Sequence, residues 1–129
     1  MYIEGFVSFI LEEMKECVQS NNFVVKSTVK NDDFMAEYFI TREVQRNVLL
    51  ALTTRDFFNF SESRNFPGRY VHEFCPTHSL TKFDGTVKDV EIYIKFEVER
   101  EDETDVQTVV ISFHPPDGRH INYPFRGVS

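Results

Sequence analysis

The sequence lacks several features that identify common classes of protein. It has no tryptophan, two cysteines without a CxxC pair, and no apolar run near the ~20 residues of a membrane-spanning helix. Residues 1–11 carry Glu4 and lack the basic start of a signal peptide. With 129 residues the chain has the length of one domain. We therefore expect a single domain over residues 1–129, located in the cytoplasm and without membrane contact.

Positive charge is also scarce. The chain has 14 Lys and Arg against 21 Asp and Glu, a formal net charge of -7. Broad binding to nucleic acid needs clustered positive charge, so any such activity requires a local basic patch. A Gly-rich phosphate loop, GxSxG and HExxH are all absent. The sequence therefore predicts no cofactor.

Apolar residues follow helical spacing in the first part of the chain. An amphipathic helix is predicted over Tyr2–Gln19, and a second over Arg42–Leu52 with Thr41 as its N-cap. Thr53 and Asp56 resemble a capping box. The shorter predictions are an extended piece at 23–28, a turn at 31–33, a helical turn rather than an extended segment at 34–40, and a short helix at 55–60.

In the later part of the chain apolar and polar residues alternate with a period of two, which is typical of strands. Strands are predicted at 69–75, 90–98, 106–114 and 120–123, and residues 77–88 are predicted to be irregular. Helices followed by antiparallel strands indicate an α+β fold, with N-terminal helices packed on a twisted antiparallel sheet.

The strand pair from Val90 to His114 carries the main candidate site. One predicted face is apolar, with Ile92, Ile94, Phe96 and Val98 beside Val109, Ile111 and Phe113. If like faces pair, Tyr93, Lys95, Ser112 and His114 share the other, exposed face. Tyr93 is then opposite or diagonal to His114, at the ~5 to 8 Å of cross-strand neighbours.

These residue types suit phosphodiester cleavage. His114 can transfer a proton near neutral pH, and Tyr93 can donate a hydrogen bond or stack on a base. Lys95, with Arg69 or Arg119, can bind the phosphate on which charge develops. The alternative is that all of them are ordinary side chains on a solvated face.

A metal site is the other pattern considered. His72, Cys75 and His78 form H-x2-C-x2-H. Strand alternation points His72 and Cys75 to opposite faces, and the sequence places no fourth ligand. We therefore predict no metal, and interpret both cysteines as structural.

The chain resembles the MqsR family of toxins from bacterial toxin-antitoxin systems, which have a RelE-like fold. The resemblance covers about Asn47 to His114, and the last fifteen residues run past the family's usual end. Four blocks in order carry it: 47–52 leading to Arg55-Asp56-Phe57-Phe58, then Tyr70-Val71-His72-Glu73-Phe74-Cys75-Pro76, then Val90-Glu91-Ile92-Tyr93-Ile94-Lys95-Phe96, then Val109-Val110-Ile111-Ser112-Phe113-His114.

The resemblance implies an endoribonuclease that cuts mRNA without a metal, by attack of the ribose 2′-hydroxyl, and that a cognate antitoxin protein holds inactive. Tyr93 matches the family's active-site tyrosine, and His114 falls where its catalytic lysine is expected. Asn59 stands in place of a lysine and Val71 in place of a glutamine. The predicted catalytic residues are His114, Tyr93 and Lys95, and the predicted substrate-binding residues are Arg69, Arg119, Asn59 and His72.

The charge of -7 and the residues at 59 and 71 leave a second function open. In this alternative the chain is a diverged toxin on the same fold, a non-catalytic interaction protein that binds a protein partner.

Overall fold

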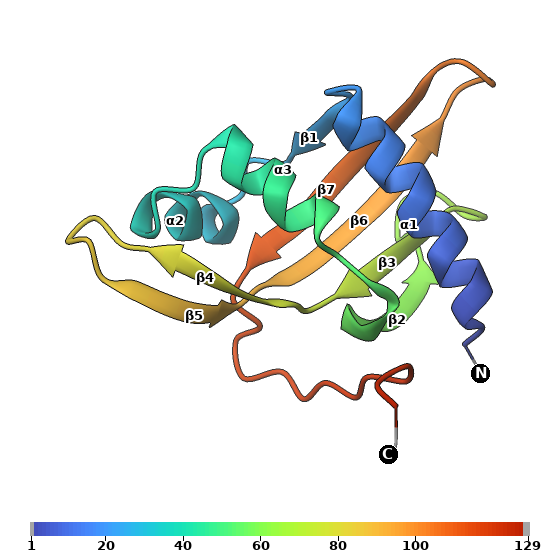
Figure 1. Cartoon of the computed structure of the whole chain (residues 1–129). Coiled ribbons are helices and arrows are strands. Elements are labelled where there is room, and N and C mark those ends of the chain that lie inside the picture. The colour runs from blue at the N-terminus through green and yellow to red at the C-terminus, as the bar shows by residue number, and fades with distance from the viewer. Residues whose placement is uncertain (1, 128–129) are drawn as a thin grey trace.

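Three α-helices pack against a five-stranded mixed sheet in the computed structural model, which describes residues 2–127 (Figure 1). A separate two-stranded hairpin extends beside the sheet within the same residues. The α+β prediction is thereby confirmed. The elements are α1 (Glu4–Gln19), β1 (Phe23–Val25), α2 (Val29–Glu37), α3 (Arg42–Leu50), a 3-10 helix (Thr54–Asp56), β2 (Phe57–Glu62), β3 (Tyr70–Phe74), β4 (Thr77–Thr81), β5 (Val87–Glu91), β6 (Tyr93–Arg100) and β7 (Val106–His114).

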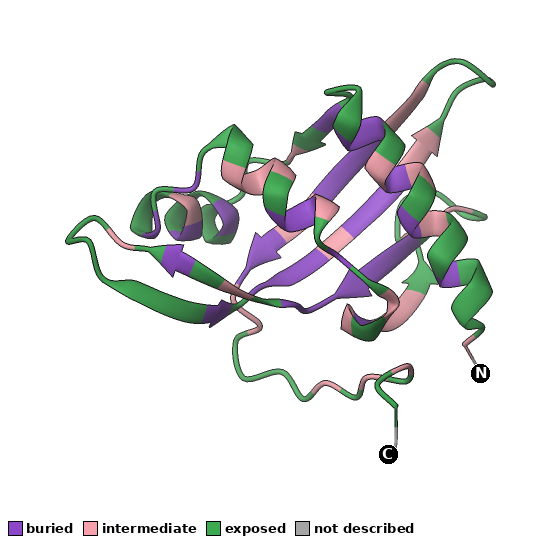
Figure 2. Cartoon of the chain, in the orientation of Figure 1, coloured by how far each residue is buried: buried purple, intermediate pink, exposed green. Residues whose placement is uncertain are grey.

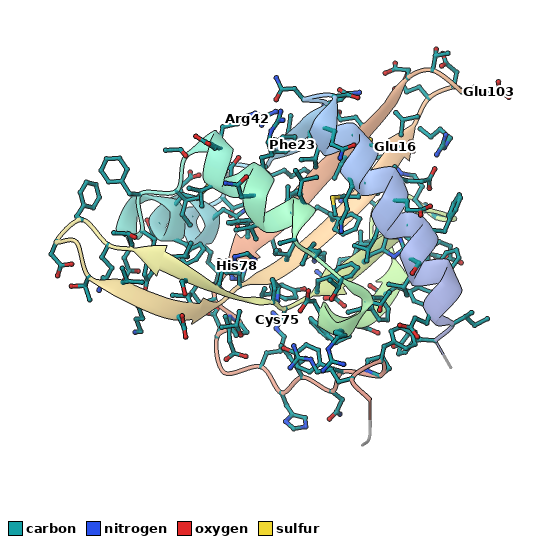
Figure 3. The ribbon with its side chains drawn as sticks, in the orientation of Figure 1. Glu16, Phe23, Arg42, Cys75, His78 and Glu103 are labelled. Carbon is teal, nitrogen blue, oxygen red and sulfur yellow. The ribbon has the colours of Figure 1, made fainter. Side chains whose placement is uncertain are left out.

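The sheet has the strand order β1-β7-β6-β3-β2. β1 runs parallel to β7 and the other neighbours are antiparallel, so the predicted purely antiparallel sheet is wrong at this edge. β1 is anchored here by α3, because the Arg42 guanidinium lies 3.7 Å from the centre of the Phe23 ring and donates to the Phe23 carbonyl (2.7 Å; Figure 3). Since β1 follows the long helix α1, it starts at the same end of the sheet as β7 (Figure 1).

The core lies between the helices and one face of the sheet. Its largest fully buried side chains include five phenylalanines, one each from β1, β2, β3, β6 and β7: Phe23, Phe57, Phe74, Phe96 and Phe113. Buried residues run along the central strands and the inner side of α1 (Figure 2). Within residues 2–127 no helix covers the other face of the sheet, and we call it the open face.

A local capping signal correctly predicted the start of α3. Thr41 accepts a hydrogen bond from the Val44 N–H, and α3 forms as expected. Thr28 caps α2 in the same way, so residues 31–33 are helical and the predicted turn is wrong. The capping box of Thr53 and Asp56 is present, but it opens only the 3-10 helix.

Several predicted segments are wrong. Residues 57–60, predicted to be helical, belong to β2, because Phe57 packs in the core against Phe74, with ring centres 5.5 Å apart. Residues 77–88 are largely the β4–β5 hairpin rather than irregular, and residues 120–123 are not a strand. No helix within residues 2–127 has the length and apolar character needed to cross a membrane.

A β-bulge breaks the predicted alternation in β7. Lys95 pairs with Ser112 but Phe96 pairs with Val110, so Ile111 is the extra residue. Val110 therefore lies in the core, whereas Val109 and Ile111 line a groove on the open face. The predicted apolar row of Val109, Ile111 and Phe113 is wrong for its first two members.

The side chain of Asn31 stabilises this bulge. It is fully buried, donates to the carbonyls of Ile111 (3.0 Å) and Lys26 (2.9 Å), and accepts from the Phe113 N–H (2.8 Å). The amide thus satisfies buried backbone groups that lie past the end of the β1–β7 pairing.

We expect Asn31→Ala to lower the free energy of unfolding by about 2 kcal/mol, because it leaves buried backbone groups without partners. Urea denaturation measures the change. The control is Asn65→Ala, at an exposed asparagine, which should stay within about 0.5 kcal/mol of the parent chain. Equal stability of the two variants would contradict the role of Asn31.

Candidate functional site

Tyr93 and His114 face each other across β6 and β7 on the open face. They are directly paired in the register, and their ring centres are 5.5 Å apart. The predicted juxtaposition is confirmed. The predicted exposure is wrong, because only 2% of Tyr93 and 7% of His114 is accessible. The Arg119 guanidinium lies 4.1 Å from the centre of the Tyr93 ring, and the Phe58 ring centre is 5.9 Å away.

Glu73 of β3 joins this pair, and the sequence prediction missed it. The Tyr93 hydroxyl donates to one oxygen of the Glu73 carboxylate, and Asn59 Nδ2 donates to the other (2.6 Å). The side-chain oxygen Oδ1 of Asn59 in turn accepts from the Tyr2 hydroxyl (2.5 Å). The sequence did carry one signal for Glu73. In the predicted strand at 69–75 this carboxylate alternates with the apolar side chains of Val71 and Cys75.

This network fixes the protonation of Tyr93. Burial, and then the hydrogen bond to the Glu73 carboxylate, raise the pKa of the Tyr93 phenol above its usual 10. The phenol is therefore neutral at physiological pH and acts as a hydrogen-bond donor. Its orientation is set by the same bond.

His114 is held through one nitrogen and left open at the other. Its Nδ1 lies 2.7 Å from the Pro115 carbonyl oxygen, which can only accept, so we assign the proton to Nδ1. In the neutral ring Nε2 then carries a lone pair and can take a proton. His114 also lines a pocket of about 200 Å³ beside α2, together with Lys30 and Asp117.

Two cationic side chains lie near the pair. Lys95 is half-buried on the open face, as the cross-strand neighbour of both Glu73 and Ser112. Arg119 follows β7 and covers the Tyr93 ring. The side chains gathered at this end of the open face are Tyr93, His114, Glu73, Lys95, Asn59 and Arg119, and we call them the tyrosine-histidine cluster.

Arg69 does not belong to the tyrosine-histidine cluster. It pairs with Glu97 and with Glu99 (3.0 Å), and hydrogen bonding to Glu97 raises the pKa of its guanidinium. Glu97 and Glu99 are four and six residues from Tyr93 along β6, so Arg69 is about 13 to 20 Å away at the rise of a β-strand. The charge of Arg69 is therefore paired with carboxylates at the end of the open face far from Tyr93.

His72 lies on the opposite face of the sheet, against the predicted substrate-binding role. Only 5% of it is accessible, and its ring centre is 5.7 Å from that of Phe96 and 6.3 Å from those of Phe6 and Phe60. Burial lowers the pKa of its imidazole to about 4, so the ring is neutral. His72 is a core residue under α1.

A groove on the open face continues from the tyrosine-histidine cluster. It encloses about 530 Å³ between the strands and the loop that follows β2. Its apolar surface comes from Val71, Val109 and Ile111. Its charged lining is mixed, with three cations and three carboxylates: Lys26, Arg64, Lys95, Glu62, Glu97 and Glu99. We call it the open-face groove.

The H-x2-C-x2-H residues do not converge. His72 lies in the core, Cys75 is buried, and His78 lines a separate cleft. No group of three or more His, Cys, Asp or Glu side chains in residues 2–127 is arranged to hold a metal ion. Burial raises the pKa of the Cys75 thiol to about 11, which makes it a poor nucleophile.

Comparison with known proteins adds no family to this geometry. No protein-family model matches the sequence, and a search of curated proteins found no match.

Proposed function

We propose that the chain is an mRNA-cleaving endoribonuclease toxin with RelE-like architecture, partnered by an antitoxin protein. The observation that carries this proposal is the tyrosine-histidine cluster, in which an imidazole, a neutral phenol and two cations meet around one carboxylate. Asn59, Val71, Tyr93 and His114, the positions that the MqsR resemblance singled out, all lie toward the open face.

The geometry supports cleavage by the ribose 2′-hydroxyl. His114 Nε2 accepts the hydroxyl proton as the oxygen attacks the adjacent phosphorus. The bond to the 5′-oxygen breaks, and the imidazolium returns a proton to that leaving oxygen. The products are a 2′,3′-cyclic phosphate and a 5′-hydroxyl. Lys95 and Arg119 bind the phosphate oxygens as charge develops on them.

The remaining groups have positioning roles in this proposal. Glu73 accepts from Tyr93 and Asn59 and so fixes the phenol beside the imidazole. The open-face groove offers apolar surface at Val71 and Ile111 for the base of a neighbouring nucleotide. Arg119 is exposed, so its guanidinium can bind a phosphate oxygen from its place over the Tyr93 ring.

A second function is favoured by a different observation. Tyr93 and His114 are almost fully buried, which is unusual for residues that must touch a substrate. A non-catalytic protein that binds a protein partner would keep them as a structural network. RNA affinity measured against salt separates the two functions, because a clear negative slope of log affinity on log salt counts against binding to protein alone.

Incubating purified full-length protein with mRNA in the presence of EDTA tests the proposal. We expect fragments that end in 2′,3′-cyclic phosphate, and growth arrest when the protein is induced without its genomic neighbour. Intact RNA, together with normal growth, would contradict the enzymatic function. A short antitoxin-like reading frame beside the gene would support the proposed partner.

A further inference from the structure

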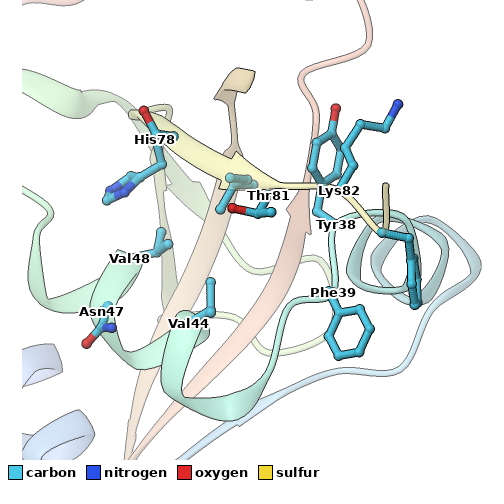
Figure 4. Close-up of a pocket in the computed structure, with 11 residues that line it drawn as sticks. Tyr38, Phe39, Val44, Asn47, Val48, His78, Thr81 and Lys82 are labelled. Carbon is cyan, nitrogen blue, oxygen red and sulfur yellow. The ribbon is translucent and has the colours of Figure 1, made fainter. Parts of the chain in front are cut away.

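A second surface lies away from the tyrosine-histidine cluster, where the β4–β5 hairpin passes α3. A cleft of about 500 Å³ separates them, and Figure 4 shows His78 and Thr81 of β4 across from Val44 and Val48 of α3. Its apolar lining comes from Tyr38, Phe39, Val44, Val48, Leu80 and Phe83. We call it the hairpin cleft. The catalytic proposal gives it no role.

The edge of β4 that borders the hairpin cleft has free backbone groups. Two backbone hydrogen bonds flank β4: Lys82 N–H donates to Thr86 O (2.9 Å), and Ile92 N–H donates to Pro76 O (2.9 Å). In the β4–β5 ladder the even-numbered residues of β4 therefore direct their N–H and C=O groups toward β5. The ladder alternates, so the N–H and C=O groups of Ser79 and Thr81 point away from β5. Within residues 2–127 no group of the chain pairs with them.

The side chains of Ser79 and Thr81 agree with this direction. Both are exposed, and the Ser79 hydroxyl bonds to Asp89 across the hairpin (2.6 Å), on the face opposite buried Leu80. Both residues nevertheless line the hairpin cleft. They therefore present their backbone edge to it.

The mouth of the hairpin cleft carries an exposed aromatic pair. Phe39 is 58% and Phe83 71% accessible, and their ring centres are 4.5 Å apart. The φ angle of Phe39 is 55°, a left-handed conformation in which α2 ends and the ring is directed outward. Exposed aromatic rings beside an apolar cleft mark contact surfaces.

We propose that the edge of β4 binds an extended segment of a partner protein, which adds a third strand to the hairpin and inserts an apolar side chain into the hairpin cleft. Backbone donors and acceptors repeating every second residue match a peptide strand, and nucleic acids, lipids and small ligands lack this repeat. No carboxylate lines the described cleft, whereas Lys82 and His78 do. Glu37 lies outside the lining with its carboxylate 3.8 Å from Lys82 Nζ, so an acidic residue of the segment competes with Glu37 for Lys82. The segment therefore carries an acidic residue next to its apolar one.

A phage-displayed library of random linear peptides, selected against the full chain, tests this interaction. The selected peptides should combine a large apolar residue with an acidic one. On binding, the amide protons of Ser79 and Thr81 should become protected from hydrogen exchange. Absence of selected peptides, or protection elsewhere on the chain, would overturn the proposal.

A matched pair of variants locates the binding edge. Thr81 and Val87 face each other in the hairpin, so proline at either position removes only an outward N–H, from β4 and β5 respectively. Thr81→Pro should weaken peptide binding about tenfold or more, and Val87→Pro should leave it unchanged. Equal effects of the two variants would contradict binding at β4.

Two further measurements keep the test decisive. If Thr81→Pro fails to fold by circular dichroism, Val44→Trp fills the hairpin cleft without touching the edge and should also abolish binding. If the chain self-associates and Thr81→Pro abolishes this association, the occupant is a second copy, and the proposed partner is wrong. RNA cleavage should be unchanged in Val87→Pro and Val44→Trp, which separates this proposal from the catalytic one.

Discussion

His114→Ala is expected to lower the rate of RNA cleavage by about 10²- to 10⁴-fold, the usual contribution of a positioned acid–base group. The imidazole lies against the neutral Tyr93 phenol, and its Nδ1 is held by the Pro115 carbonyl. Alanine removes the Nε2 lone pair that accepts the 2′-hydroxyl proton. The measurement is single-turnover cleavage of a defined RNA, with binding affinity determined separately.

The matched control for this change is His120→Ala. His120 is an exposed histidine in the segment after β7, outside the tyrosine-histidine cluster. Its replacement should leave cleavage within about twofold of the parent rate, an amount set by small shifts in binding. If His114→Ala cleaves as fast as His120→Ala, the proton transfer belongs to another group.

The prediction of the site succeeded where it depended on local alternation. The period of two placed Tyr93 and His114 on one face, but the β-bulge at Ile111 is what sets them directly opposite. Without the bulge, the pairing of Phe96 with Val110 near the turn would place Tyr93 opposite Phe113. Glu73 was missed because a lone carboxylate in a strand usually indicates a solvated face. Its burial depends on contacts from β2 and β6, which are distant in sequence.

Local sequence patterns also could not predict that the segment after β7 covers Tyr93. The segment after β7 returns to the sheet because Tyr123 donates to the Cys75 carbonyl (2.8 Å) and Phe125 stacks on Phe57, with ring centres 5.7 Å apart. These contacts direct Arg119 across the Tyr93 ring. Nothing in the sequence of the segment itself indicates which surface it covers.

The fold shows the same division between local and distant causes. Thr41 marked a helix start correctly because an N-cap bond spans three residues. The β4–β5 hairpin was missed because its side chains are mostly exposed, with Leu80 and Val90 as its buried residues, so alternation is weak. The turn signal was present at Gly85, whose φ of 86° requires glycine.

Stability is expected to fall in acid because of His72, and replacing it should remove about 3 kcal/mol of this pH dependence. Burial lowers the pKa of the imidazole from 6.5 to about 4. Between these values the unfolded chain binds a proton that the folded chain excludes, so the free energy of unfolding decreases as pH falls. A span of about 2.5 pH units at about 1.4 kcal/mol per unit gives this magnitude. Above pH 6.5 neither the folded nor the unfolded chain binds this proton, so the loss of stability due to His72 is absent there.

His72→Phe isolates this effect. Phenylalanine keeps the aromatic contacts with Phe6, Phe60 and Phe96 and cannot take up a proton. Urea denaturation at pH 7 and at pH 4 should show the variant losing about 3 kcal/mol less than the parent chain, whatever its stability at pH 7. His120→Ala, at an exposed imidazole, should lose as much as the parent. Parallel losses in His72→Phe and the parent would show that the folded chain accepts the proton at His72, against its burial beneath α1.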